Sequence, residues 1–392
     1  MRSLELFAGA GGLGLGLHAA GFSPQKVVEW DRYCCDTLRE NRERASTGVR
    51  SWSDITEGDV RSESFARYEG VLDLVSGGPP CQPFSMGGRH RAYDDARDMF
   101  PQAIRAVREA RPKAFVFENV KGLTRASFRN YFSYVQLQLE HPEVTARPDE
   151  GWEDHLARLE RHHTSGQRYD LHYRVVTRLL NAADYGVPQK RERVFFVGFR
   201  DDLGLEWNFP APTHTQEALV SDQFRGDYWD RHNIAAPPGA VAPRFLTSLA
   251  NQSERPNTAP WRTVRDAVAD LPDPQTDPKA AKSIPNHKFQ PGARAYPGHT
   301  GSPLDFPAKT LKAGVHGVPG GENMMVKSDG SVRYFTVRES ARLQTFPDDF
   351  VFHGSWSETM RQLGNAVPVE LAAVVGRSVA ALLMPSGRGQ LQ

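Results

Sequence analysis

The sequence predicts an α/β fold with a doubly wound parallel sheet, followed by a second, smaller and loop-rich unit. Through the first 120 residues, short apolar runs alternate with stretches whose apolar residues recur at helical spacing, the pattern of strand–helix–strand units. Residues 201–300 then hold 13 of the chain's 28 prolines and show little periodicity, which is typical of loops. A chain of 392 residues is long enough for a sizeable core and for two domains.

Five apolar runs are expected to form strands of the sheet: residues 4–7, 26–29, 71–75, 114–117 and 193–198. Apolar residues at helical spacing predict helices over residues 99–110, 336–345, 357–363 and 369–383. The last of these is apolar and Ala-rich, so it is expected to pack back on the first domain. The polar and aromatic stretch 125–170 is expected to form helices on the outside of the sheet.

The composition excludes several classes of protein. Because 48 basic and 47 acidic residues nearly cancel, any nucleic-acid site must be a local basic patch. Three cysteines, of which Cys34 and Cys35 are adjacent, exclude a disulfide framework and a Cys-x-x-Cys zinc site. His162 and His163 have no cysteine pair nearby, so a solvated loop is expected there and no metal. No apolar run approaches a membrane span, and the strand-like start leaves no signal peptide, so a reduced, cytoplasmic location is expected.

A glycine-rich loop joins the first expected strand to the helix after it. Residues 9–14 read Gly-Ala-Gly-Gly-Leu-Gly, which fits G-x-G-x-x-G, and Glu29 lies 20 residues after Gly9, at the end of the next strand. Glycine lets the backbone approach a ligand closely, and the carboxylate can accept hydrogen bonds from ribose hydroxyls. This pattern leaves NAD, FAD and S-adenosylmethionine open, as well as a tight turn without a ligand. Phe7 and Trp30 lie at the mouth of the loop and can flank an adenine or a cationic sulfonium, which favours S-adenosylmethionine.

One cysteine stands between prolines directly after an expected buried strand. Residues 77–85 read Gly-Gly-Pro-Pro-Cys-Gln-Pro-Phe-Ser, and the prolines force a stiff turn. Open α/β folds place their chemistry at the carboxyl ends of their strands, so Cys81 is a candidate nucleophile. Free cysteines are also commonly buried as small apolar residues. The local sequence leaves both roles open.

A carboxylate and two arginines follow on other strands. Glu118 ends the run that starts at residue 114, so it is expected at the same sheet edge as Cys81, partly desolvated and able to carry a proton. A loop-fixing acid is the alternative for Glu118. Arg191 and Arg193 are expected to point to one side of their strand. That side either binds a base carbonyl or a phosphate, or is a solvated face.

In their order along the chain, these segments resemble the motifs of the cytosine-5 DNA methyltransferases. The chain has Phe-Ala-Gly-Ala-Gly-Gly at 7–12, Pro-Cys-Gln at 80–82, Glu-Asn-Val at 118–120 and Gln-Lys-Arg-Glu-Arg at 189–193. Two further matching segments lie at 338–348 and at 362–368, the latter reading Gln-Leu-Gly-Asn-Ala-Val-Pro. The resemblance covers residues 1–200 and 333–385. It implies a Rossmann-like sheet of the S-adenosylmethionine-dependent methyltransferases beside a smaller, loop-rich target-recognition domain.

The resemblance implies catalytic roles for four matched residues. Cys81 would be the nucleophile, and Glu118 would contact ring nitrogen 3 and the exocyclic amine of cytosine. Arg193, together with Arg191, would support the ring carbonyl and the attacking cysteine. The mobile catalytic loop would span residues 85–100. Contacts from this region to DNA would come from Gln82, Ser85, Arg89, Arg91 and Arg97.

The same resemblance implies a cofactor site for S-adenosylmethionine. Asp59 and Asp54 compete for the adenine, and Asp59 is preferred because Gly58-Asp59 fits the motif at the usual distance from Cys81. The residues implied to surround the cofactor are Phe7, Ala8, Gly9, Gly11, Gly12, Glu29, Trp30, Asp59, Val60, Pro80, Met99, Asn365 and Val367.

The implied division of the chain has three parts. Residues 1–199 would form the catalytic and cofactor-binding domain, 200–332 the target-recognition domain, and 333–392 a C-terminal segment packing back on the first domain. Residues 279–327 hold seven Lys or Arg against two acids, whereas acids predominate from 201 to 277. Lys309, Lys312 and His316 are therefore expected to contact double-stranded DNA, with a solvated basic face as the alternative.

The implied activity is transfer of a methyl group from S-adenosylmethionine to carbon 5 of a flipped-out cytosine in a specific double-stranded DNA sequence, through a covalent adduct of Cys81. The commonest setting for this architecture is bacterial modification, with a cognate restriction endonuclease acting on the same site. A monomer in the bacterial cytoplasm, associated with the nucleoid and needing neither membrane nor metal, is expected.

Three other functions remain to be weighed. A nicotinamide-dependent oxidoreductase would explain the glycine loop and Glu29, but it leaves Cys81 and Glu118 without a shared purpose. A catalytically silent DNA-binding relative is disfavoured because both of those residues are present. An RNA substrate is disfavoured because the Cys-Phe-Thr tripeptide of the tRNA-modifying relatives does not follow Glu-Asn-Val here.

Overall fold

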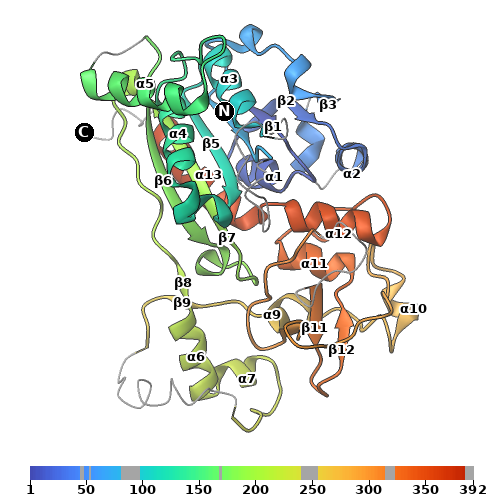
Figure 1. The fold of residues 1–392 in the computed structure, drawn as a ribbon. Coiled ribbons are helices and arrows are strands. Elements are labelled where there is room, and N and C mark those ends of the chain that lie inside the picture. Colours follow the sequence, from blue (N-terminus) through green and yellow to red (C-terminus); the bar gives the residue numbers. More distant parts are fainter. Residues whose placement is uncertain are drawn as a thin grey trace, which may run out of the picture.

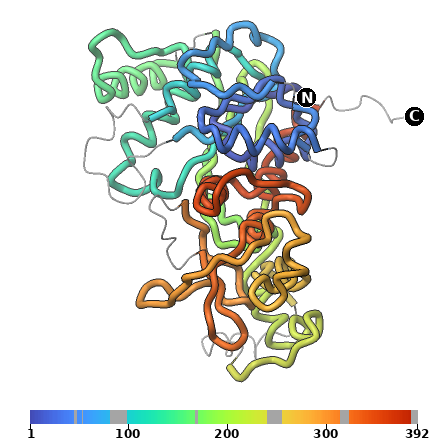
Figure 2. The backbone as a smooth tube through the Cα atoms, turned by 90° about the vertical axis from the view of Figure 1, so that its right-hand side faces the viewer, coloured from blue at the N-terminus to red at the C-terminus, as the bar shows by residue number. Residues whose placement is uncertain are grey.

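The computed structural model describes residues 1–44, 48–52, 54–80, 98–166, 170–239, 255–313 and 323–384. A layered α/β part contains both the first half of the chain and its C-terminal helix (Figure 1). A smaller part with short elements lies beside it, built from residues between about 214 and 345 (Figure 2).

The centre of the larger part is a seven-stranded sheet in the order β3-β2-β1-β4-β5-β7-β6. Its strands are β1 Arg2–Leu6, β2 Ser23–Glu29, β3 Ile55–Glu57, β4 Leu74–Gly77, β5 Ala114–Val120, β6 Tyr173–Asn181 and β7 Glu192–Arg200. Strands β1 to β5 pair in parallel, as expected, and their order is that of a doubly wound, Rossmann-like sheet.

The last two strands differ from the expected parallel sheet. β7 pairs antiparallel with both β5 and β6, so the sheet is mixed. Only residues 182–191 separate β6 from β7, and so short a connection permits an antiparallel neighbour but not a parallel crossover. β6 was not expected from the sequence because Arg174, Arg178 and Leu179 are exposed and the strand lies at the sheet edge.

The expected helices at the C-terminus and after residue 99 are confirmed. The helices of the larger part are α1 Gly12–Ala19, α2 Arg32–Glu43, α3 Phe100–Ala110, α4 Arg129–Glu140, α5 Trp152–Ser165, α12 Trp356–Asn365 and α13 Val369–Leu383. α11 Val337–Leu343 packs against both parts. α4 and α5 form in the stretch expected to cover the outside of the sheet. His162 and His163, expected in a solvated loop, instead lie in the last turn of α5.

Successive side chains along each strand point to opposite faces of the sheet, and an apolar core lies on each face. Phe115 and Phe117 of β5 pack with α3 and α4, whereas Val116 packs with α1 and α13. α13 approaches α1 very closely: a Cβ added at Gly16 would lie 2.4 Å from the Cβ of Ala372. The expectation that the C-terminal helix packs back on the first domain is therefore confirmed.

The segment Trp356–Leu383, which comprises α12 and α13, is long and apolar enough to cross a membrane by length and composition alone. The expectation that no apolar run approaches this length is wrong by that measure. However, 56% of the most apolar window is buried inside the protein. Packing of α13 against α1 accounts for its apolar residues.

The smaller part contains short elements and few strands. Its helices are α6 Gln216–Arg225, α7 Asp227–Arg231, α9 Val264–Val268 and α10 Pro278–Ala281, and its strands are β8 His214–Thr215, β9 Ala259–Pro260, β10 Ser302–Pro303, β11 Met324–Val326 and β12 Val332–Tyr334. β12 pairs with β11, so the three-stranded sheet extends past residue 332. Phe335 and Leu343 share a core with α9, which joins α11 to this part.

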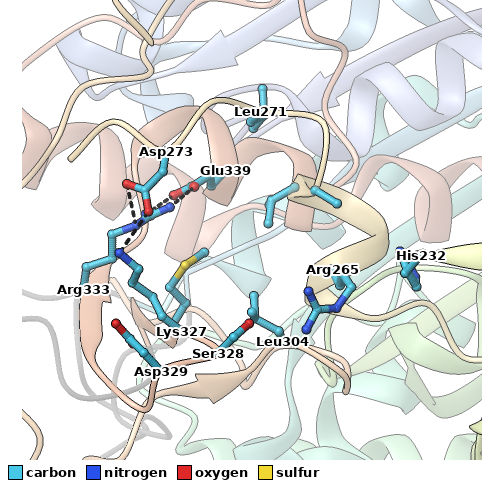
Figure 3. Close-up of a pocket in the computed structure, with 13 residues that line it drawn as sticks. His232, Arg265, Leu271, Asp273, Leu304, Lys327, Ser328, Asp329, Arg333 and Glu339 are labelled. Atoms are coloured by element: carbon cyan, nitrogen blue, oxygen red, sulfur yellow. Dashed lines mark hydrogen bonds and ion pairs between the residues drawn. The ribbon is translucent and has the colours of Figure 1, made fainter. Parts of the chain in front are cut away.

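A pocket of about 510 Å³ opens in the smaller part, between the β11–β12 strands and α9 (Figure 3). Arg333 lies between Glu339, whose Oε1 is 2.6 Å from Nη2, and Asp273. Lys327 Nζ is 3.1 Å from the same Asp273. These ion pairs join β12, α11 and the chain after α9 in the wall of the pocket.

One buried carboxylate should make stability depend on pH. Glu5 of β1 accepts a hydrogen bond from Ser76 Oγ, and burial raises its pKa to about 8. The native state therefore keeps a proton that the unfolded chain loses above about pH 4.5, so stability falls as pH rises towards 8. Relative to the Glu5→Gln variant, the wild-type free energy of unfolding should fall by about 2 kcal/mol between pH 6 and pH 8 in urea titrations. Parallel pH profiles for the two proteins would contradict this, and the same change at the exposed Glu153 is the control.

Candidate functional site

The carboxyl ends of the parallel strands meet at one edge of the sheet. β1 ends at Leu6, β2 at Glu29, β4 at Gly77 and β5 two residues after Glu118. The sequence-predicted cofactor loop, proline-rich turn and carboxylate therefore lie along the same edge. Open α/β folds bind ligands at this edge.

Glu118 forms a buried ion pair with Arg193. Its Oε1 lies 2.7 Å from Nε of Arg193, and the two side chains are 8% and 11% exposed. In the antiparallel register Glu118 faces Phe195, so Arg193 is its diagonal neighbour on the same face. Burial raises the pKa of Glu118, while the charges of Arg193 and Arg191 oppose that rise. The carboxyl group is thus able to hold a proton while remaining fixed by a cation.

Arg191 lies just before β7 and is fully buried. It donates hydrogen bonds to the carbonyl oxygens of Leu311, at 3.1 Å, and of Gly364, at 2.7 Å. Burial lowers the pKa of Arg191, the charge of Arg193 lowers it further and Glu118 opposes both. The sequence grouped Arg191 with Arg193; the structure brings both near Glu118 but gives Arg191 backbone partners.

The backbone that enters the proline-rich turn is held by β5 and by the start of α3. Asn119 Nδ2 donates to the carbonyl of Pro79 at 2.9 Å, and the backbone N–H of Met99 donates to the carbonyl of Pro80 at 3.1 Å. A Cβ added at Gly78 would lie 3.4 Å from Glu118 Oε2. The chain thus passes beside Glu118 three residues before the candidate nucleophile. Outside the described residues lie Cys81, Gln82, Ser85, Arg89, Arg91 and Arg97.

Glu29 holds the glycine loop in place. Its Oε2 accepts the backbone N–H of Gly9 at 2.7 Å, and its Oε1 accepts those of Trp30 and Asp31 at 2.9 and 2.8 Å. Burial raises the pKa of this carboxyl group, and the three N–H donors oppose the rise. The sequence suggested only a ligand contact for Glu29, whereas the structure adds a role in shaping the loop.

The glycines of the loop differ in what lies next to them. A Cβ at Gly9, where φ is +56°, would meet nothing within 4 Å, so this position faces open space. At Gly12 it would lie 2.2 Å from the carbonyl oxygen of Val367, and at Gly11 it would lie 2.8 Å from Leu38 Cδ2. Gly9 therefore leaves room for a ligand. Gly12 lets Val367, which lies between α12 and α13 and two residues after Asn365, pack against the loop. Ala8 within the loop is buried.

Several side chains around this open position suit an adenosine. The Trp30 ring is 75% exposed, and Phe7, with φ of +52°, is partly buried at the mouth of the loop. β2 and β3 are parallel, so Asp59, two residues after β3, lies at the carboxyl edge with Glu29, whereas Asp54 precedes β3 and lies at the opposite edge. Asp54 Oδ2 is 3.6 Å from Lys26 Nζ. Val60 is buried beside Phe7.

The basic stretch contacts the segment that leads into β7. Ala308 pairs with residues 188–190, just before β7, through two backbone hydrogen bonds, which brings the chain that carries Lys309 and Lys312 to this segment. Lys309 Nζ donates to Thr300 Oγ1 at 2.9 Å, and the Lys312 side chain is exposed. His316 lies outside the described residues. Asn323 brackets the Lys312 backbone with two 3.0 Å hydrogen bonds, a support that no sequence pattern indicated.

A Rossmann-like sheet whose carboxyl edge carries a glycine loop, a buried carboxylate and a guanidinium is the scaffold of an enzyme that uses an adenosine-containing cofactor. The chain matches the family model of the C-5 cytosine-specific DNA methylases over residues 1–142 and 166–381. It is 33% identical over 388 residues to the Type II methyltransferase M.PspPI of Psychrobacter, covering 97% of this chain and 79% of that protein. Identity to the Type II methyltransferase M.NgoMIV of Neisseria gonorrhoeae is 32%, covering 96% of each chain.

The solved structure of the Dnmt2 methyltransferase of Schizosaccharomyces pombe has the same fold, with a TM-score of 0.56 at 16% identity, covering 98% of this chain and 99% of that one. The chain belongs to the C-5 cytosine-specific DNA methylase family. It is a DNA (cytosine-5)-methyltransferase of the restriction-modification type.

Proposed function

We propose that this enzyme transfers the methyl group of S-adenosylmethionine to carbon 5 of a cytosine flipped out of a specific double-stranded DNA sequence. The observation that carries the proposal is the buried Glu118–Arg193 pair, which adjoins Gly78, three residues before Cys81. A duplex buries both faces of a paired base in the stack, so a cysteine and a carboxylate can reach the same ring only after the base is extruded.

The proposed chemistry starts at Cys81. Carbon 5 of cytosine is a poor nucleophile, and addition of a thiolate at carbon 6 turns the ring into an enamine that can attack a methyl sulfonium. Loss of the carbon-5 proton then expels the cysteine and restores the ring. The prolines on either side of Cys81 restrict the backbone and so help to fix the direction of the sulfur atom.

Glu118 is proposed to hold a proton at ring nitrogen 3. Covalent addition at carbon 6 pushes electron density onto that nitrogen, so a neutral carboxyl group next to it stabilises the adduct. Burial, which raises the pKa of Glu118, supports this role. Arg193 would keep the carboxyl group oriented and donate to the ring carbonyl, while Arg191 would position the surrounding backbone.

S-adenosylmethionine, when bound, would supply the electrophilic methyl group. The open position at Gly9, the exposed ring of Trp30 and the carboxylates of Glu29 and Asp59 fit its adenosine. Because Glu29 already accepts the Gly9 N–H, it would hold the loop in shape before the cofactor arrives. The residues proposed to surround the cofactor are Phe7, Ala8, Gly9, Gly11, Gly12, Glu29, Trp30, Asp59, Val60, Pro80, Met99, Asn365 and Val367.

The three-part division of the chain is also part of the proposal. Residues 1–199 would bind cofactor and catalyse, 200–332 would recognise DNA, and 333–392 would complete the catalytic domain. Contact of the 308–312 segment with residues 188–190 supports a recognition region that abuts the catalytic edge. The enzyme would act as a monomer in the bacterial cytoplasm, on nucleoid DNA, and protect sites cut by a cognate restriction endonuclease.

Bisulfite sequencing tests this function. Plasmid DNA from cells that express the wild-type chain should show protected cytosines in one short sequence, because 5-methylcytosine resists deamination. DNA from cells expressing the Cys81→Ser variant is the matched control and should show none. The absence of protected cytosines in the wild-type sample, with the protein present and folded, would overturn the proposal.

Lys309 and Lys312 should contribute to the affinity for DNA but not to the choice of DNA sequence. Removing one lysine that neutralises a phosphate should reduce the slope of log K against log salt by about 0.9. The double variant Lys309→Ala and Lys312→Ala should therefore bind all duplexes more weakly, with a slope shallower by up to about 2, measured by fluorescence anisotropy. Lys279→Ala with Lys282→Ala, on and beside α10, provides the charge-matched control. An unchanged slope would assign Lys309 and Lys312 to a solvated face.

A further inference from the structure

Glu140, His141 and His163 bring three possible metal ligands together outside the catalytic site. Nε2 of His141 lies 3.0 Å from Nδ1 of His163, which lies 3.4 Å from Oε2 of Glu140. All three donor atoms are within 4.8 Å of one another. Two ligands bound tetrahedrally to zinc at their usual bond lengths lie about 3.3 Å apart. The two measured separations are close to that distance.

The ends of two helices favour a cation at the same place. Tyr134 contacts Trp152 and His155 near the start of α5, and His141, directly after α4, contacts His163 near the end of α5. The two helices therefore run side by side in the same direction, with both carboxyl ends next to the cluster. The partial negative charge at each carboxyl end attracts a positive ion.

The surroundings are rich in imidazole. The rings of His162 and His172 lie 4.8 and 4.9 Å from the ring of His141, measured between centroids. Glu140 and His141 are themselves buried. A divalent ion would offset the cost of burying this carboxylate. Imidazole nitrogens with one carboxylate are a donor set for zinc, and magnesium and calcium prefer oxygen ligands alone.

The cluster is remote from the chemistry. His172 directly precedes β6, and Tyr173, the first residue of β6, pairs with Arg200 at the end of β7. Arg193, the partner of Glu118, lies near the start of β7 and therefore at the opposite end of the strand. An ion here would not take part in methyl transfer.

We propose that Glu140, His141 and His163 form a structural zinc site that fastens the carboxyl end of α5 to that of α4, with a water as the fourth ligand. The ion would replace the hydrogen bond between His141 and His163 with two metal–nitrogen bonds. The ion would thereby join the two helices at their carboxyl ends, where the side chain of His163 is half exposed.

The test uses the full chain without a polyhistidine tag, freed of metal by a chelator. Zinc chloride is titrated against a chromophoric chelator, and cobalt chloride is added separately to record the visible spectrum of the bound ion. We expect one zinc per chain, a rise in the thermal unfolding midpoint with zinc, and a cobalt spectrum of low coordination number. His163→Ala should lower zinc affinity at least 100-fold, about the upper limit seen for outer-shell residues, and Glu140→Gln should lower it about 10-fold or more.

A matched control is available in His353. Its side chain is 50% exposed, as that of His163 is, and it lies 3.9 Å from Asp36 and 3.8 Å from Glu40. His353→Ala should bind zinc as the wild type does. In the metal-free state all three variants should have the thermal unfolding midpoint of the wild type. A loss of zinc binding then cannot be explained by a loss of the folded structure.

Zinc binding below about 0.2 equivalents per wild-type chain at micromolar zinc, or undiminished binding by His163→Ala, would overturn the site. Methyl transfer by the zinc-free enzyme is expected to be normal, and a requirement for zinc would contradict the structural assignment.

Discussion

Replacement of the Cys81 sulfur by oxygen is expected to abolish methyl transfer while leaving DNA affinity intact. A serine hydroxyl is hardly ionised at neutral pH and is a far weaker nucleophile than a thiolate, so addition at carbon 6 should fail. We expect Cys81→Ser to lower the single-turnover rate by a factor on the order of 10⁴ to 10⁶, as for other enzymes that lose their nucleophile. Rapid-quench measurement of tritiated methyl incorporation gives this rate, and anisotropy gives the affinity.

A covalent readout separates the nucleophile from a residue that only positions the base. DNA with 5-fluorocytosine at the target has no carbon-5 proton to lose, so the adduct should persist through denaturing electrophoresis for the wild type and not for Cys81→Ser. Cys34→Ser is the matched control, since Cys34 is buried and its burial raises its thiol pKa far above neutrality. Cys34→Ser should form the adduct. Adduct formation by Cys81→Ser would remove Cys81 from the mechanism.

Glu118→Gln is expected to slow the chemical step by about 10² to 10⁴-fold, the usual contribution of a positioned acid. The amide has the size of the carboxyl group and can still accept from Arg193, but it cannot give up a proton to ring nitrogen 3. Burial raises the pKa of Glu118, so a rising pH should deprotonate the carboxyl group. The wild-type enzyme then loses its rate advantage over Glu118→Gln. The ratio of wild-type to variant single-turnover rates should therefore fall as pH rises, and the thiolate dependence of Cys81 cancels in that ratio.

The control for Glu118→Gln must share the loss of a buried ion pair. Glu339→Gln provides it, because Glu339 is 1% exposed and pairs with Arg333 away from the catalytic edge. Removing one partner of a buried pair costs about 3–5 kcal/mol, so both variants should lose stability in urea titrations. Only Glu118→Gln should lose the chemical rate. Equal single-turnover rates for Glu118→Gln and wild type would contradict its role as the proton donor.

The parts of the fold that follow from local pattern could be predicted. Residues 369–383 are mostly apolar, with Glu370, Arg377 and Ser378 as the polar exceptions, and α13 spans the same residues. The run at 71–75 predicts a strand too early, because Val71 is exposed and β4 begins only at Leu74. β7 has an apolar sequence that fits either direction of pairing. Its antiparallel pairing follows from the short connection to β6. β6 itself could not be predicted, because its exposed arginines interrupt the apolar pattern of a strand.

The candidate site was predictable where motif residues act through their own side chains. Glu118 and Arg193 meet as their strand positions suggest. Gly12 fits a ligand-binding pattern, yet its missing side chain admits the carbonyl of Val367, a partner more than 350 residues away that no local pattern reveals. The meeting of His141 with His163 likewise depends on the packing of two helices, and the intervening sequence contains no ligand spacing that indicates it.

The hydrogen bonds of Arg191 affect which side chains can be substituted without loss of its contacts. The Arg191 guanidinium donates to two carbonyl oxygens. One belongs to Leu311 in the basic stretch and the other to Gly364 near the end of α12. A carbonyl oxygen is present whatever side chain the residue carries. The contact of Arg191 with the basic stretch is therefore independent of the side chain at position 311, so one guanidinium can keep this segment in register with the start of β7 while that side chain varies.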